Sequence, residues 1–172
     1  PIAPISGKSI FQLHAEKIRA LQNRYRTSIP WYIMASETNN RATQDFFMSH
    51  NFFGLEPQMV EFFTQGMLPV VDCRGKVLMN SPSSIIMSPN GHGGSIIALR
   101  DKGMVADMKR RGIAYLFYHQ VDNVLIRMAD PVFLGYHVGN QAEMSLKVVR
   151  KRHCEEKVGI VGSIDGGLQV IE

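Results

Sequence analysis

Apolar residues recur at helical spacing near the start of the chain and gather in short continuous runs further along. Ser9 and Gln12 stand in the arrangement of a capping box, which marks the start of a helix. The residues that follow at the spacing of one helix face are Ile10, Leu13, Ile18, Leu21 and Tyr25. The pattern therefore predicts a helix over about residues 10–25.

Three short runs are almost continuously apolar: Trp31–Ala35, Met59–Phe63 and Ala114–Tyr118. Such runs are typical of strands that are buried on both faces, as in a parallel sheet. A polar loop at 36–40 follows the first run, and the residues after it predict a short helix that ends near His50.

The middle of the chain has a different pattern. Apolar residues at 68–71 and 76–79 flank a turn at 73–75, which predicts a hairpin. Helical spacing resumes after Gly94, with a break at Gly103, and Asp130 with Pro131 marks another helix start. From Leu146 to Ile171 we expect strands with a turn at 165–167. Strands alternating with helices predict an α/β fold, with a mixed sheet covered on both sides.

The composition is that of an ordinary globular protein, with 45% apolar and 20% charged residues in 172. No apolar run approaches the roughly 18 residues of a membrane span, and the start carries no signal-peptide pattern. Cys73 and Cys154 show neither a disulfide framework nor metal-ligand spacing, which favours a reducing cytoplasm. The net charge of +4 comes without an aromatic-basic motif for nucleic acid, and it suits a ligand rich in phosphate.

The loop from Met87 to Gly94 carries the first candidate chemistry. Its glycines stand before a predicted helix, where backbone amides can meet an anion or the flat edge of a ligand. A plain tight turn explains the same residues. The loop is not a dinucleotide fingerprint, because the third glycine would fall at Ile96, and Ser6–Ser9 is not a P-loop, because the first glycine would fall at Ile2.

Asp122 is the second candidate, at the end of the third predicted strand. A carboxylate there is costly to bury unless it is paired. It can take a Mg²⁺ that arrives with phosphates, or it can cap the following turn. The six histidines show no zinc spacing, and only His92 lies inside a candidate site. No arrangement for nucleophilic catalysis is present in the spacing.

A set of motifs then follows in a characteristic order: Ile29–Met34, Gln65–Pro69, Met87–Gly94, Val121–Asn123, Ala129–Pro131, Lys147–Val149, Val158–Gly159 and Val170–Glu172. Together they resemble the UDP-N-acetylglucosamine (UDP-N-acetylhexosamine) pyrophosphorylase family, which is related to the eukaryotic UDP-glucose pyrophosphorylases. The resemblance implies a Rossmann-like nucleotide-diphospho-sugar transferase fold. It also implies a Mg²⁺-dependent uridylyltransferase that joins UTP and N-acetylglucosamine 1-phosphate, giving UDP-N-acetylglucosamine and pyrophosphate.

The resemblance also implies roles for individual positions. Gln65 matches a glutamine that contacts uracil, and Gly91 a glycine that packs on the uracil ring. Asp122 matches the aspartate that holds Mg²⁺ between phosphates. Gly159 and Glu172 match residues that bind sugar hydroxyls. For Lys147 two roles stay open, a contact to a phosphate or an ordinary place on the surface at the end of a strand.

Two departures from the family pattern leave alternatives open. His92 stands where the family has an asparagine that touches the sugar, and the resulting Gly-His-Gly is closer to the UDP-glucose enzymes. The family's Gly-Gly-x-Gly-Thr-Arg phosphate loop is expected before Pro1, and further binding positions after Glu172. We therefore expect residues 1–172 to be the central part of a nucleotidyltransferase domain. A UDP-glucose or broad-range enzyme, or a UDP-sugar-binding module without turnover, are the alternatives; oligomeric state is not indicated.

Overall fold

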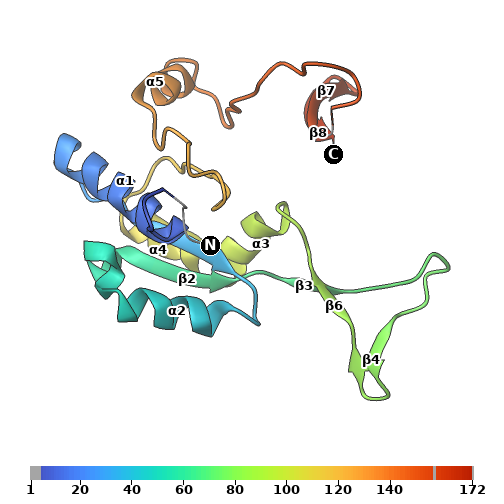
Figure 1. Ribbon diagram of the computed structural model, residues 1–172. Helices are drawn as coiled ribbons and strands as arrows, with labels where there is room; N and C mark the ends of the chain where they lie inside the picture. The colour runs from blue at the N-terminus through green and yellow to red at the C-terminus, as the bar shows by residue number, and fades with distance from the viewer. Residues whose placement is uncertain (1–4, 157, 172) are drawn as a thin grey trace. The chain divides into compact units, whose positions relative to one another are not determined.

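The computed structural model describes residues 5–156 and 158–171 and divides into two compact units, Pro1–Met128 and Ala129–Glu172 (Figure 1). The helices and strands of the first unit are α1 (Ile10–Tyr25), β1 (Trp31–Ala35), α2 (Asn40–Ser49), η1 (Asn51–Gly54), η2 (Pro57–Met59), β2 (Val60–Thr64), β3 (Met67–Pro69), β4 (Met79–Ser81), β5 (Ser84–Ile85), β6 (Met87–Pro89), α3 (Gly94–Asp101) and α4 (Met104–Arg110). The second unit contains α5 (Pro131–Gly139), β7 (Ile160–Ile164) and β8 (Gly167–Ile171).

The helix starts that the sequence predicts are confirmed. Ser9 Oγ accepts a hydrogen bond from the backbone N–H of Gln12 at 3.1 Å, but the Gln12 side chain donates to Glu16, so only half of the capping box forms. Asp130 caps α5 by accepting from the N–H of Val132 at 3.1 Å. These signals work because a side-chain oxygen satisfies an N–H that has no partner within the helix.

The first two apolar runs form a parallel pair, β1 and β2, in which Tyr32 lies opposite Glu61. One face of the pair packs against α1 and α2. The buried residues of this core are Ala15, Ile18, Ile33, Phe47, Leu55 and Val60. Phe47 is fully buried, with its ring centroid 5.5 Å from that of Trp31 and 5.2 Å from that of Phe62.

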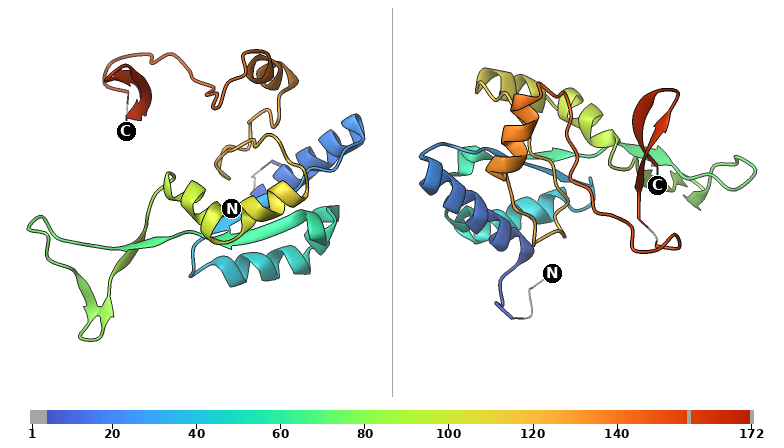
Figure 2. Two further views of the ribbon diagram at one scale, coloured as in Figure 1. Left: turned by 180° about the vertical axis from the view of Figure 1, so that it is seen from behind. Right: turned by 90° about the horizontal axis from the view of Figure 1, so that it is seen from above.

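The opposite face of the pair packs against α4. Tyr32 Oη donates to Asp107 Oδ2 at 2.6 Å, and Arg111 joins Asp107 at 2.6 Å to Glu61 at 2.9 Å. Because neighbouring residues of a strand point to opposite faces, Tyr32 and Glu61 lie on this face while Ile33 and Phe62 lie on the other. Helices therefore cover both faces of β1 and β2, as expected; Figure 2 gives the view from behind, with α4 in front of the strands.

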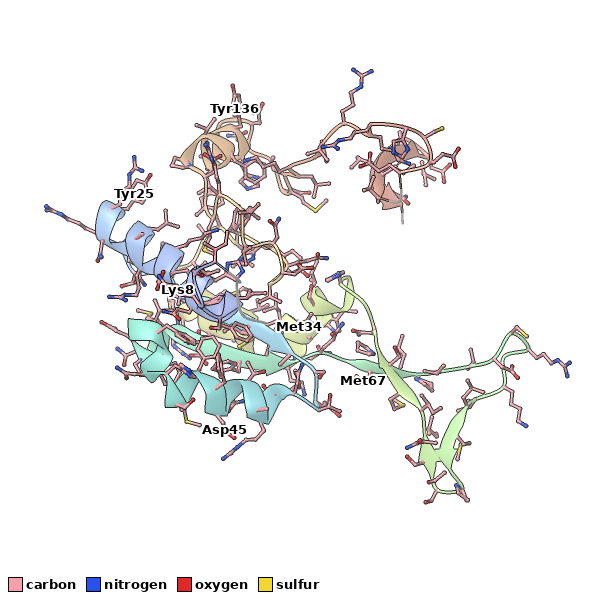
Figure 3. All side chains as sticks on the ribbon, viewed as in Figure 1. Lys8, Tyr25, Met34, Asp45, Met67 and Tyr136 are labelled. Atoms are coloured by element: carbon pink, nitrogen blue, oxygen red, sulfur yellow. The ribbon has the colours of Figure 1, made fainter. Side chains whose placement is uncertain are left out.

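The predicted hairpin is confirmed within a larger antiparallel extension. Its turn closes with hydrogen bonds between Asp72 and the backbone of Gly75 and Lys76, and β3 then pairs with β6. Backbone bonds from Val70 to Ile86 and from Leu78 to Val70 hold three chain segments side by side. The extension projects away from β1 and β2, and its apolar side chains beyond Met67 are largely exposed (Figure 3).

Two other strand predictions are wrong. Neither Ala114–Tyr118 nor Leu146–Val149 forms a strand, and Tyr115, Leu116 and Tyr118 are more than half exposed. Within the described ranges the strands form four two-stranded sheets, one parallel and three antiparallel, rather than a single mixed sheet. The reason is that an apolar run expresses only a preference for burial, whereas a strand exists only where a neighbouring strand accepts its hydrogen bonds.

Candidate functional site

Gln65 lies immediately after β2 and reaches the glycine loop. Its backbone N–H bonds to the carbonyl of Ala35 at 2.8 Å, which continues the ladder of the parallel pair by one residue. Its side-chain Nε2 donates to the carbonyl of Gly91 at 2.8 Å. The two residues expected at a uracil site are therefore in direct contact, although they are 26 positions apart in the chain.

Asn90 explains why glycine is needed at Gly94 in the loop and at Gly66 outside it. Its backbone N–H donates to Gly66 at 3.1 Å, and its side chain lies between Gly66 and Gly94. A Cβ on Gly66 would come within 2.7 Å of Asn90 Nδ2, and a Cβ on Gly94 would overlap the Asn90 amide group. Gly91 has a different reason, since its φ of +76° is in the left-handed region and the space beside it is open.

His92 links the glycine loop to the segment before Asp122. Its Nε2 lies 2.8 Å from Gln120 Nε2 and its Nδ1 lies 3.0 Å from the hydroxyl of Tyr118. The Gln120 nitrogen is a donor only, so His92 Nε2 accepts and Nδ1–H donates to Tyr118, with the amide oriented as it is placed. Both ring nitrogens are thus occupied, and the loop is fixed to a segment 26 to 28 positions further along.

Asp122 lies in an exposed turn and not at the end of a strand, which corrects the position expected for it. Its backbone carbonyl accepts from Val124 N–H at 2.9 Å, so the turn is closed by the main chain and the capping role considered for the carboxylate is wrong. Within the described ranges the carboxylate has no hydrogen-bond or ion-pair partner, which leaves it available to a ligand.

The Asp122 carboxylate fits a magnesium ion whose other ligands come from a bound substrate and water. Among the described residues no group of three or more His, Cys, Asp or Glu side chains is arranged to hold a metal ion. Mg²⁺ commonly takes one or two carboxylates and completes its coordination with phosphate oxygens and water. A single exposed, unpaired carboxylate is compatible with that arrangement and not with a metal held by protein alone.

The turn rests on α1, which the sequence did not single out. His14 is fully buried and lies 2.7 Å, through Nε2, from the carbonyl of Val121. Lys17 Nζ donates to the carbonyls of Val124 and Ile126, the latter at 3.1 Å. Burial lowers the pKa of the His14 imidazole and also that of Lys17. The sequence did carry a signal for this contact, because His14 and Lys17 are two polar residues three apart on the apolar face of a helix.

The remaining expected residues do not belong to the first unit. Gly159 lies in the second unit, just before β7, and Glu172 lies outside the described residues. Lys147 Nζ bonds Asp130 at 3.1 Å and lies 5.9 Å from the centre of the Phe133 ring. The site built from the first unit therefore comprises Gln65, Gly91, His92 and Asp122. None of the described helices has the length and apolarity needed to cross a membrane.

Comparison with known proteins identifies the class. The family described as UTP--glucose-1-phosphate uridylyltransferase matches residues 2–172, and the chain belongs to that family. Within it, the chain belongs with the UDP-N-acetylglucosamine and UDP-N-acetylhexosamine pyrophosphorylases, as the motifs indicated.

Three relatives illustrate the similarity. UDP-N-acetylglucosamine diphosphorylase 2 of Arabidopsis thaliana is 45% identical over 90% of this chain and 33% of its own length. UDP-N-acetylhexosamine pyrophosphorylase-like protein 1 of Homo sapiens is 42% identical over 97% of the chain and 34% of its own length. The crystal structure of the uridine diphosphate N-acetylglucosamine pyrophosphorylase from Trypanosoma brucei, in complex with an inhibitor, is 30% identical with a TM-score of 0.87, covering 98% of this chain and 36% of that one. The chain spans about a third of the length of these relatives.

Proposed function

We propose that this chain forms the central part of the catalytic domain of a uridylyltransferase that makes UDP-N-acetylglucosamine and pyrophosphate from UTP and N-acetylglucosamine 1-phosphate. The observation that carries the proposal is the convergence of the glycine loop with two other segments. Gln65 bonds to Gly91, and His92 bonds to Gln120, two residues before Asp122. Membership of the family and a parallel pair covered by helices on both faces support the Rossmann-like transferase fold.

The site residues suit the two ends of a uridine nucleotide, with Gln65 and Gly91 at the base and Asp122 at the phosphates. Gln65 uses its amide nitrogen on Gly91, which leaves Oε1 to accept a hydrogen bond from the N–H of uracil. The open space beside Gly91 lets a flat ring lie against the backbone. The bare Asp122 carboxylate would hold Mg²⁺, which when bound neutralises phosphate charge.

The reaction is an in-line displacement. An oxygen of the sugar phosphate attacks the α-phosphorus of UTP, and pyrophosphate leaves, so no covalent enzyme intermediate is required. Positioning of the two substrates and stabilisation of charge supply the catalysis. This agrees with a site that contains an amide, a bare backbone and a carboxylate but no activated nucleophile.

Glucose 1-phosphate is the second candidate substrate, because His92 stands where the family has an asparagine that touches the sugar, and both of its ring nitrogens have partners. A ring whose Nε2 already accepts from Gln120 offers a ligand different donors and acceptors from those of an asparagine amide. The sugar preference therefore depends on whether His92 keeps these partners when the sugar binds.

The test measures pyrophosphate release by the protein that contains this chain, with UTP, Mg²⁺ and each sugar phosphate in turn. We expect release with N-acetylglucosamine 1-phosphate, and a fall in kcat of about a hundredfold or more in Asp122→Asn, the size typical for loss of one charge-stabilising group. Asp45→Asn, at an exposed aspartate of α2, is the matched control and should keep full activity. UTP binding without any release would favour the binding module, and an active Asp122→Asn would refute the metal role.

A further inference from the structure

The turn that carries Asp122 has few hydrogen bonds of its own. Val124 N–H bonds to Asp122 at 2.9 Å, while the bonds from Asn123 to Gln120 and from Ile126 to Asn123 are both 3.3 Å long. Bonds at that length lie beyond the usual range for N–H···O contacts and are weak. The geometry of residues 120–126 therefore depends on contacts from elsewhere in the fold.

His14 supplies one of these contacts from the interior. A neutral imidazole has one N–H, and the carbonyl of Val121 can only accept, so the proton resides on Nε2. The ring is wedged between Trp31 and His119, with centroid distances of 6.3 and 4.8 Å, and Nδ1 is buried without a partner. Burying Nδ1 without a partner is costly. The bond from Nε2 to Val121 is therefore the polar contact that favours this position of the ring.

Lys17 supplies two more contacts, one turn further along α1. Its ammonium donates to the carbonyls of Val124 and Ile126. Residues three apart lie on the same face of a helix, so His14 and Lys17 approach the same loop together. Three carbonyls, at positions 121, 124 and 126, are thus fixed to α1 on both sides of Asp122. The Asp122 side chain itself is exposed.

We infer that His14 and Lys17 are positioning residues for the transfer reaction, which hold the Asp122 carboxylate where it can meet the substrate phosphates and their Mg²⁺. The inference rests on the proposed function of Asp122. In this role each residue acts through the backbone carbonyls of the turn that it contacts. A purely structural role would make the same contacts but would leave the carboxylate's affinity for Mg²⁺ unchanged in the folded protein.

The variants separate donor loss from loss of folding. His14→Leu and Lys17→Met remove the donors, whereas His14→Gln and Lys17→Arg retain an N–H that can reach the same carbonyls. Arg24→Met is the matched control, because Arg24 is an exposed basic residue of the same helix whose guanidinium lies over Tyr25 and not on the loop. All variants are compared only where thermal unfolding shows a folded protein at the assay temperature.

The first readout requires no activity. Hydrogen–deuterium exchange of the metal-free protein should be faster by about tenfold at the amides of Val124 and Ile126 in His14→Leu and Lys17→Met, since local opening of the turn becomes easier. Exchange in α2 should stay the same. Unchanged exchange in the turn would overturn the inference, as would equal acceleration throughout the protein.

The second readout is the Mg²⁺ concentration for half-maximal pyrophosphate release. We expect it to rise by about tenfold in His14→Leu and Lys17→Met, with a lower kcat and little change in KM for UTP, and to recover in His14→Gln and Lys17→Arg. An unaltered Mg²⁺ dependence in folded variants would overturn the inference. If the unsubstituted protein releases no pyrophosphate, the proposed function fails instead, and Mn²⁺ binding in the presence of UTP, followed by electron paramagnetic resonance, replaces the activity readout with the same expected shift.

Discussion

The glycine at position 94 offers a direct test of how the glycine loop is built. In Gly94→Ala the added Cβ overlaps the side-chain amide of Asn90, which lies between Gly94 and Gly66. The neighbouring Gly93 has φ −60° and ψ −30° and nothing within 4 Å of an added Cβ. The two substitutions add the same methyl group one residue apart, and they differ chiefly in what that methyl meets, because Gly93 is the N-cap of α3 and Gly94 is its first residue.

The expected magnitudes follow from these surroundings. Gly94→Ala forces the whole Asn90 amide, whose Oδ1 is buried, to move, and such overpacking costs about 1–3 kcal/mol in the free energy of unfolding. Gly93→Ala places alanine in a conformation it adopts readily. Alanine restricts the unfolded chain, which stabilises the fold, and it is a slightly poorer N-cap than glycine, which destabilises it. The two effects leave a net change in the free energy of unfolding within about 0.5 kcal/mol. The two variants should therefore differ by about 1–3 kcal/mol.

Urea unfolding of both variants, followed by circular dichroism, measures the difference. A second pair, Asn90→Ala and the double variant Asn90→Ala/Gly94→Ala, completes a double-mutant cycle. Removing the Asn90 amide should abolish most of the penalty at Gly94. The reasoning is refuted if Gly94→Ala is as stable as Gly93→Ala, or if its penalty is undiminished without the Asn90 side chain.

Three further predictions test the core, the charged network and the sugar site. Phe47→Ala should lower the free energy of unfolding by about 3–5 kcal/mol in urea, because Phe47 is fully buried among aromatic rings. Hydrogen bonds from the Tyr32 hydroxyl and then from Arg111 hold the pKa of Asp107 below its usual range. The stability that the ionised Asp107 contributes is therefore complete above about pH 4 and is lost as pH falls through the pKa of the folded state. Asp107→Asn should unfold at a lower temperature than the unsubstituted protein at pH 7, and its unfolding temperature should fall less on acidification. His92→Asn should shift the ratio of kcat/KM values toward N-acetylglucosamine 1-phosphate over glucose 1-phosphate, and an unchanged ratio would remove His92 from sugar selection.

Signals that act within a few residues were the ones predicted correctly from the sequence. The caps at Ser9 and Asp130, the break at Gly103 and the turn at 165–167 all appear in the structure. Each depends on a backbone conformation or hydrogen bond that neighbouring residues decide by themselves. The family motifs were also recognised from sequence, because family resemblance requires residue identities and no coordinates.

The strand predicted at Ala114–Tyr118 does not form, which shows that an apolar pattern alone does not predict strand pairing. Its apolar pattern resembles that of Trp31–Ala35, yet only the latter has a strand to pair with in the structure. The position of Asp122 was misjudged for the same reason, since it was derived from a strand that does not form. A pattern states what a segment prefers, and its neighbours decide whether the preference is met.

By itself, then, the sequence determined the helix caps and turns, the family and the identity of Gln65, Gly91, His92 and Asp122 as candidates. Only the tertiary structure decided which residues hold them. Asn90 fills the space that two glycines leave, and His14 reaches Val121 across 107 positions of chain. The pairings of Asn90 with Gly66 and of His14 with Val121 carry no local signal, because the partners are far apart in the chain and only the fold brings them together.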